Sequence, residues 1–289
     1  MSTNEKNGVV DNPWRRLREF TDARIGLGRT GISLPTAELL AFQLAHAQAR
    51  DAVHFPLDKD ALISALKESD ITGHFDILTL HSQADDRMTY LQRPDLGRRL
   101  DERSCRLLQN VHKGFHQNFH PEKPQDYDLA PEYDLAFVIV DGLSSRAVAQ
   151  NTLAFLEALI PQLSKDASPW RIAPLTIIDQ GRVAIGDDVG ERLNARAVIV
   201  LVGERPGLSS PDSLGLYLTW APRVGLTDAS RNCISNIRPA GLAYSEAARR
   251  TLYLLREARQ LKLSGVNLKD RTQDDVVGTV SSTKNFLIS

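Results

Sequence analysis

The spacing of hydrophobic and polar positions changes midway along the chain. In the first part apolar residues recur at helical spacing, which predicts helices at about residues 36–54, 58–69 and 98–117. Asn12 followed by Pro13 is a helix start, so residues 14–24 are expected to be helical as well. No strand is expected before about residue 130.

After a proline-rich linker at residues 121–131, the apolar residues form short uninterrupted runs rich in β-branched side chains. The runs lie at residues 135–140, 175–178 and 197–202. Strands without alternation are buried on both faces, which is typical of a parallel sheet covered by helices. Helical patterns at about residues 145–163 and 245–261 complete βαβ units.

These patterns predict the α/β class, with a helical N-terminal domain followed by a Rossmann-like three-layer αβα domain whose sheet is mostly parallel. The predicted divisions are a flexible leader at residues 1–12, the helical domain at 13–125 and the Rossmann-like domain at 126–289.

Length and composition agree with a soluble globular protein of two domains. The 289 residues carry 35 basic and 36 acidic side chains, a net charge of −1, and 42% of the residues are hydrophobic. That balance argues against a protein that mainly holds duplex nucleic acid. No apolar run approaches the ~20 residues of a membrane span, and none follows the polar start as in a secretory signal. Two cysteines make no disulfide framework, so a reduced cytosolic protein is expected.

Two motifs that could mark a ligand site have simpler interpretations. The glycines at 26, 28 and 31 match a dinucleotide fingerprint, which must follow a strand and open a helix. A charged helical segment precedes them, so a flexible loop between helices is favoured. His112, His116 and His120 are spaced four apart, but Pro121 follows directly and no carboxylate or cysteine lies at ligand spacing. No metal site is predicted.

Polar, glycine-bearing loops follow all three predicted strands, at residues 141–145, 183–187 and 203–208. Each has a local interpretation: Asp141 as a helix cap, Glu204 with Arg205 as a solvated pair, and Pro206-Gly207 as a turn. Ligands of open parallel sheets bind beyond the carboxyl ends of the strands. Three such loops at one edge therefore predict a small-molecule site.

Two further observations limit this interpretation. The stretch at residues 232–238 is too polar in its middle for a simple core strand. No Ser-His-Asp, Cys-His or paired-carboxylate arrangement is identifiable, so no catalytic residue is predicted.

Eight stretches occur in an order that resembles the small (light) subunit of ethanolamine ammonia-lyase, over about residues 15–270. They are RIGLGR at 24–29, SLPT at 33–36, RDAVH at 50–54, DGLS at 141–144, VAIGD at 183–187, GERPGL at 203–208, RNCISNI at 231–237 and SGVN at 264–267. The combination of GERPGL with CISNI is specific.

The resemblance implies a hetero-oligomer of large and small subunits that uses adenosylcobalamin to convert ethanolamine to acetaldehyde and ammonia. In this family the large subunit holds ethanolamine and the small subunit covers the cofactor from the other side. The hard chemistry belongs to the cofactor, and the protein supplies binding and orientation.

Carried over by position, the cobalamin contacts of the family fall on Val183, Glu204 and Cys233. A carboxylate can accept hydrogen bonds from the amides of the corrin rim, a valine offers an apolar surface, and a cysteine is a small polarizable neighbour. Asp141, Ser144 and Arg205 are weaker candidates. No histidine lies in an Asp-x-His-x-x-Gly motif, so the cofactor is expected base-on, without a cobalt ligand from this chain.

The sequence is also compatible with two other functions. One is a stand-alone nucleotide-dependent enzyme that uses the Rossmann-like half, and another is a structural shell protein. Relatives of the family work free in the cytosol or inside bacterial microcompartments. The basic segment at residues 14–24 fits an encapsulation signal, or packing on the large subunit.

Overall fold

A computed structural model describes residues 5–6, 8–116 and 132–269 of the protein. Its centre is a six-stranded sheet with the order β3-β5-β4-β6-β7-β8. The first four strands of that order are parallel, and β7 and β8 each pair antiparallel with their neighbours. The strands are β3 (Ile77–His81), β4 (Tyr133–Val140), β5 (Leu175–Asp179), β6 (Ala195–Gly203), β7 (Leu214–Trp220) and β8 (Arg231–Ile237).

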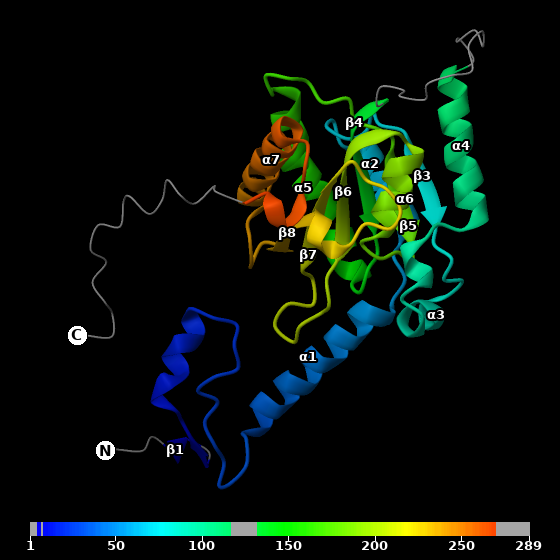
Figure 1. The fold of residues 1–289 in the computed structure, drawn as a ribbon. Coiled ribbons are helices and arrows are strands. Elements are labelled where there is room, and N and C mark those ends of the chain that lie inside the picture. The colour runs from blue at the N-terminus through cyan, green and yellow to red at the C-terminus, as the bar shows by residue number, and fades with distance from the viewer. Residues whose placement is uncertain (1–4, 7, 117–131, 270–289) are drawn as a thin grey trace.

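Helices cover both faces of this sheet (Figure 1). α5 (Ser145–Ser164) and α7 (Tyr244–Leu261) pack on one face, and α6 (Ile185–Arg192) with α4 (Glu102–His116) lies on the other. Side chains alternate along a strand, so Ile199 of β6 packs toward α5 and Val200 packs toward α6. The uninterrupted apolar runs are thus explained by burial on two sides. The α/β class and the mostly parallel sheet are confirmed, whereas the Rossmann-like assignment stays a prediction.

The predicted long helices are confirmed. Before the sheet, the structure has α1 (Thr36–His54) and α2 (Lys59–Glu68), and Asp58 caps α2 by accepting from the Ala61 N–H at 3.0 Å. Residues Pro13–Glu19 form a 3₁₀ helix, η1, in which the Asn12 side chain accepts from the Trp14 N–H at 3.0 Å. The smaller elements are β1 (Glu5–Lys6), β2 (Val9–Val10), α3 (Arg87–Gln92), η2 (Leu96–Arg98), η3 (Asp228–Ser230) and η4 (Gly265–Asn267).

The expectation of no strand before about residue 130 is wrong. β3 pairs parallel with β5 over its whole length, from Ile77 opposite Leu175 to His81 opposite Asp179. Its five residues include Thr79 and His81, and only Leu80 is buried, as suits an edge strand. Residues before 125 therefore contribute to the same sheet. The predicted boundary at 125/126 lies outside the described residues, and the division into leader and two domains stays a prediction.

The polar stretch at residues 232–238 contains an edge strand, as its composition indicated. In β8, Ile234 and Ile237 are buried against the α5–α7 side, while Cys233 before them and the two residues between them are exposed. A strand with one covered face reads as alternating rather than uniformly apolar.

α1 projects away from the sheet toward the N-terminal segment (Figure 1). Its only buried residues are Ala45 and Ala52, and Leu40 and Leu44 are 59% and 60% exposed. The apolar face predicted for this helix thus has no cover within the described residues. Among the same residues, no helix is both long and apolar enough to cross a membrane.

A buried ion pair joins α6 to β8 and provides a test of the fold. Arg231 donates to both carboxylate oxygens of Asp187, at 2.7 and 2.8 Å, and the two side chains are 2% and 3% exposed. Asp187→Asn should lower the free energy of unfolding by about 3–5 kcal/mol, because it leaves a buried guanidinium without its counter-ion. Urea unfolding measures the change.

The matched control is Asp228→Asn, which removes the second carboxylate of the same arginine. Asp228 lies 3.4 Å from Arg231 and its side chain is 97% exposed, so the unfolding midpoint should stay within error of the parent. Equal losses of unfolding free energy in Asp187→Asn and Asp228→Asn would contradict the conclusion that burial of the Arg231–Asp187 ion pair makes its disruption costly.

Candidate functional site

The order of the strands places a topological switch point at the carboxyl end of β4. The chain leaves β4 for β5 on one side, and then crosses to β6 on the other side. Ligands of open α/β sheets bind where the winding reverses in this way. Asp141 follows β4, residues 180–183 follow β5, and Glu204 follows β6, so the three predicted loops do meet at one edge.

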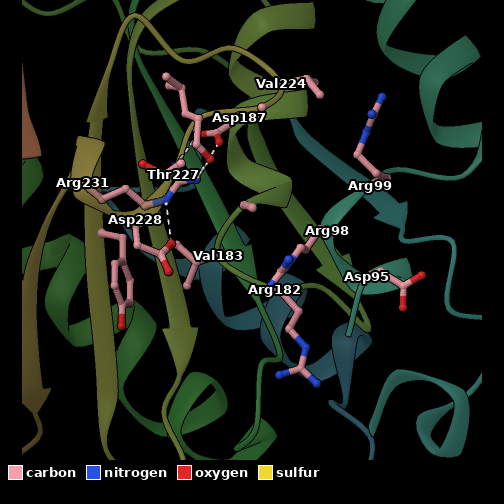
Figure 2. A pocket seen from close by; sticks show the side chains of 14 residues that line it. Asp95, Arg98, Arg99, Arg182, Val183, Asp187, Val224, Thr227, Asp228 and Arg231 are labelled. Carbon is pink, nitrogen blue, oxygen red and sulfur yellow. Dashed lines mark hydrogen bonds and ion pairs between the residues drawn. The ribbon is translucent and has the colours of Figure 1, made fainter. Parts of the chain in front are cut away.

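Val183 lies in the loop between β5 and α6 and lines a cavity of about 670 Å³. Figure 2 shows it between the Arg231–Asp187 ion pair on one side and Arg98 and Arg182 on the other. Tyr217 of β7 belongs to the same lining. The cavity therefore combines apolar side chains with both arginines and aspartates.

Glu204 is held at the end of β6 by three donors. Its carboxylate accepts from the hydroxyls of Ser213 and Ser235 and, at 3.3 Å, from the backbone N–H of Asn236. Gly215 gives it room, because a Cβ there would lie 2.8 Å from Glu204 Oε1. No Glu204–Arg205 ion pair is present among the described residues, so the solvated-pair interpretation is not what the structure shows.

Cys233 lies on β8 directly opposite Tyr217 of β7. The Tyr217 hydroxyl is hydrogen-bonded to the Cys233 thiol. Although Cys233 reaches the surface, partial desolvation of its sulfur raises the pKa of the thiol; the Tyr217 hydrogen bond lowers that pKa, and the Glu204 charge raises it. Desolvation, Cys233 and Glu204 all raise the pKa of Tyr217. Tyr217 is therefore a neutral donor at physiological pH.

Val183, Glu204 and Cys233 thus share the α6 side of the β6–β8 half of the sheet, with Tyr217 among them. Tyr217 lines the same cavity as Val183, and its hydroxyl is hydrogen-bonded to Cys233. The negative charge of Glu204 is close enough to raise the pKa of Tyr217. Beside the charged lining of the cavity, the surface offers the Glu204 carboxylate, hydroxyl groups and apolar side chains; among the described residues it pairs no general base with a nucleophile. Such a surface suits binding of a large ligand that carries hydrogen-bond donors.

The weaker candidates do not share this surface in the same way. Ser144 caps α5 by accepting from the Ala147 N–H at 3.1 Å, and it donates to the Pro211 carbonyl at 2.7 Å, so it takes the capping role considered for Asp141. Asp141 is 3% exposed and accepts from Arg87 and from the Gly181 N–H. Arg205 is exposed.

Sequence reasoning missed Tyr217, Ser213, Ser235 and Gly215. Their places depend on the antiparallel pairing of β7 and β8, which no short-range pattern in the sequence indicates. The nearest signal is the polar character of residues 232–238, which marks the exposed face of an edge strand.

The remaining motifs give no second site. Gly26, Gly28 and Gly31 all have positive φ in a loop between η1 and α1, and no strand of the six-stranded sheet precedes them. A Cβ on Gly26 would lie 2.7 Å from the Arg15 nitrogen, so a close approach of two backbone segments explains that glycine. Within the described ranges, no group of His, Cys, Asp and Glu side chains is arranged to hold a metal. The side chains of His112 and His116, and His120 entirely, lie outside the described residues.

Comparisons with known proteins bear on the same residues. A family described as "Ethanolamine ammonia-lyase light chain (EutC)" matches residues 11–269. Proteins named "Ethanolamine ammonia-lyase small subunit" are similar over nearly their whole length. The one from Pseudomonas paraeruginosa is 54% identical, covering 97% of this chain and 96% of its own. Those from Ralstonia nicotianae and Azotobacter vinelandii are 51% and 50% identical, covering 97% and 98% of this chain and 96% and 98% of their own.

The electrostatics around Cys233 generate a prediction about its reactivity. In a Cys105→Ser background, alkylation of Cys233 by iodoacetamide near neutral pH should be slow, because little thiolate is present when the pKa is raised. Glu204→Gln removes a negative charge and should speed the reaction, whereas Tyr217→Phe removes a donor to the thiolate and should slow it. Mass spectrometry measures both rates, and rate changes of the same sign would contradict this geometry.

Proposed function

The chain belongs to the ethanolamine ammonia-lyase light-chain family, and we propose that it works as the small subunit of that lyase, together with a large subunit, in the conversion of ethanolamine to acetaldehyde and ammonia. The described residues contain no assembled nucleophile and base, and a subunit that completes another chain's site needs none. The nucleotide-dependent alternative lacks the strand that its glycine fingerprint requires.

The proposed ligand of this chain is adenosylcobalamin, bound base-on at the interface with the large subunit. The observation that carries the proposal is the convergence of Val183, Glu204 and Cys233 on one open surface. When bound, the cofactor supplies the radical chemistry, and this chain binds and orients it.

The residues present fit that cofactor. A carboxylate has about four acceptor positions, and Glu204 receives three hydrogen bonds from its own chain. One position is left for an amide of the corrin rim, and the three internal bonds hold the carboxylate in a single orientation. Val183 and Tyr217 supply the adjoining apolar surface. No residue of this chain is proposed as a cobalt ligand.

The exposed face of α1 supports a large protein partner. Contiguous exposed apolar surface marks interaction sites, and Leu39, Leu40 and Leu44 are 44%, 59% and 60% exposed. The arm that precedes α1 also reaches the site: Arg24 donates to the Leu208 carbonyl at 3.3 Å, in the loop that begins at Glu204. One partner could therefore cover both surfaces, and we assign that partner to the large subunit.

The basic segment at residues 14–24 is engaged within the chain. Arg18 and Arg15 lie 2.8 and 3.4 Å from Glu38 of α1. These contacts favour packing of the arm over an encapsulation signal. Location inside a microcompartment stays a hypothesis, which fractionation of the producing cells with a shell-protein marker would test.

The direct test of the proposed function is reconstitution. The chain alone should show no lyase activity, and co-expression with its large subunit should give a complex that binds adenosylcobalamin and consumes ethanolamine. Replacing Leu40 and Leu44 by glutamate should weaken capture of the large subunit without lowering the melting temperature, because neither side chain is buried. Full turnover by the isolated chain would overturn the proposal.

Glu204→Gln tests the carboxylate of the surface proposed to bind adenosylcobalamin. The substitution keeps the shape but replaces one acceptor oxygen by a donor that faces other donors. Losing a charge-assisted bond in a closed interface should cost roughly 1.5–3 kcal/mol, a ten- to hundred-fold rise in the apparent adenosylcobalamin constant of the complex. The Michaelis constant for ethanolamine should change little.

The matched control is Glu246→Gln on α7. Glu246 also accepts from two side chains, Arg249 and Arg250, but it lies on a different element. Its substitution should leave the cofactor constant unchanged. An unaltered constant in the Glu204→Gln complex would remove Glu204 from the binding surface and favour a purely structural role for the chain.

A further inference from the structure

We infer that Asp141, acting through Arg87 and the peptide at Gly181, is a positioning residue that fixes the Val183 loop in its ligand-binding conformation. The inference rests on the proposed function, because Val183 matters only if this surface binds the cofactor. It extends that function to two residues, Asp141 and Arg87, that do not line the Val183 cavity themselves.

Asp141 connects the end of β4 to the loop that follows β5. Its Oδ1 accepts from the Gly181 N–H at 3.2 Å, and its Oδ2 lies 3.3 Å from Arg87 Nη1. The residue is 3% exposed, so no bulk water replaces these partners. The carboxylate therefore holds the loop two residues before Val183.

Arg87 is the other half of this clamp. From the first turn of α3, its Nε donates to the Val53 carbonyl in the last turn of α1 at 2.6 Å, and its Nη1 also donates to Gln180 Oε1 at 3.3 Å. The guanidinium stacks on Tyr90, 4.7 Å from the ring centroid. One partly buried cation thus joins α1, α3, the end of β4 and the loop after β5.

The loop itself is held in a conformation that it would not adopt alone. Gln180 has a φ of 54°, in the left-handed region that costs free energy for a residue with a side chain. Such a residue persists where its surroundings determine it. The Tyr90 hydroxyl donates to the Gly181 carbonyl at 3.1 Å, and the Arg182 N–H donates to the Gly97 carbonyl at 2.7 Å.

The clamp depends on the charge of Asp141. Burial raises the pKa of Asp141 to about 6, the nearby Asp179 carboxylate adds to the rise, and Arg87 opposes it. Asp179 is itself paired with Lys59 of α2. Above pH 6 the carboxylate is ionised and accepts from both partners; below pH 6 it is neutral and Arg87 loses its counter-ion.

The sign of the stability change separates positioning from folding. Because the pKa of Asp141 is higher in the folded than in the unfolded chain, protonation of Asp141 between about pH 4 and pH 6 favours the folded state. A loss of ligand affinity as the pH falls through 6 cannot then come from unfolding caused by this group. It would come from release of the loop while Asp141 stays buried: Asp141 then loses the Gly181 N–H and Arg87, which both lower its pKa, so protonation favours the released loop.

The experiment uses the complex with the large subunit and measures adenosylcobalamin binding by equilibrium dialysis, with the cofactor read by its visible absorption. The pH is varied from about one unit below to about two units above the Asp141 pKa. In the parent complex the dissociation constant should rise about tenfold as the pH falls through 6. Asp141→Asn should show about the same tenfold rise at every pH, without that step.

The matched control is Asp134→Asn, at the opposite end of the same strand. Asp134 is also buried and accepts from the Arg171 N–H at 3.0 Å, but it contacts no part of the Val183 loop. Its substitution should lower the melting temperature and leave the cofactor constant and its pH profile unchanged. If Asp141→Asn fails to fold, Arg87→Lys takes its place. Lysine keeps the positive charge but lacks the branched guanidinium that reaches several acceptors, so the dissociation constant for adenosylcobalamin should rise.

The inference would be overturned if Asp141→Asn, or Arg87→Lys in its place, kept the dissociation constant and the pH profile of the parent complex. An equal loss in Asp134→Asn would also overturn it, because the effect would then follow stability. A parent complex that binds no adenosylcobalamin would instead contradict the proposed function, so the two failures are distinguishable.

Discussion

The structure depends on the burial of β4 on every side. Its eight residues are all buried, with β5 and β6 as parallel neighbours and helices above and below. From this strand the chain goes first to β5 on one side and later to β6 on the other. The loops that carry Asp141, Val183 and Glu204 meet at its carboxyl end because of that winding.

Close packing at that edge leaves little freedom to the loops. A Cβ on Gly203 would lie 2.0 Å from the Ser144 carbonyl oxygen, and one on Gly142 would lie 2.4 Å from the Gly203 carbonyl oxygen. The turns after β4 and β6 therefore touch backbone to backbone. Glu204 follows Gly203 directly, so the packing of Gly142 against Gly203 fixes the backbone position from which the Glu204 side chain extends.

Features with a local cause could be predicted from the sequence, and features with a non-local cause could not. Uninterrupted apolar runs predicted β4, β5 and β6, and apolar residues at helical spacing predicted α1, α2 and α5. β3 escaped because five residues with one buried side chain make no clear pattern. Val183, Glu204 and Cys233 came from a resemblance, and their juxtaposition depends on Tyr217 and on the register of β7 with β8. Asp141 and Arg87 are 54 residues apart, and nothing in either segment indicates their contact.

The two halves of the candidate site differ in how they are stabilised. On the β4–β5 side, Asp141 and Tyr90 are buried, Arg87 is partly buried, and the three hold one loop by several directed contacts. On the β7–β8 side, Cys233 is exposed and Ser235 reaches the surface beside Glu204, and no helix of the described part of the chain covers the α6 side of the sheet there. A preorganised half lowers the entropy lost on binding, whereas an open half gains affinity only when another surface closes over it. The proposed division of labour between two subunits would thus have a physical counterpart inside this one chain.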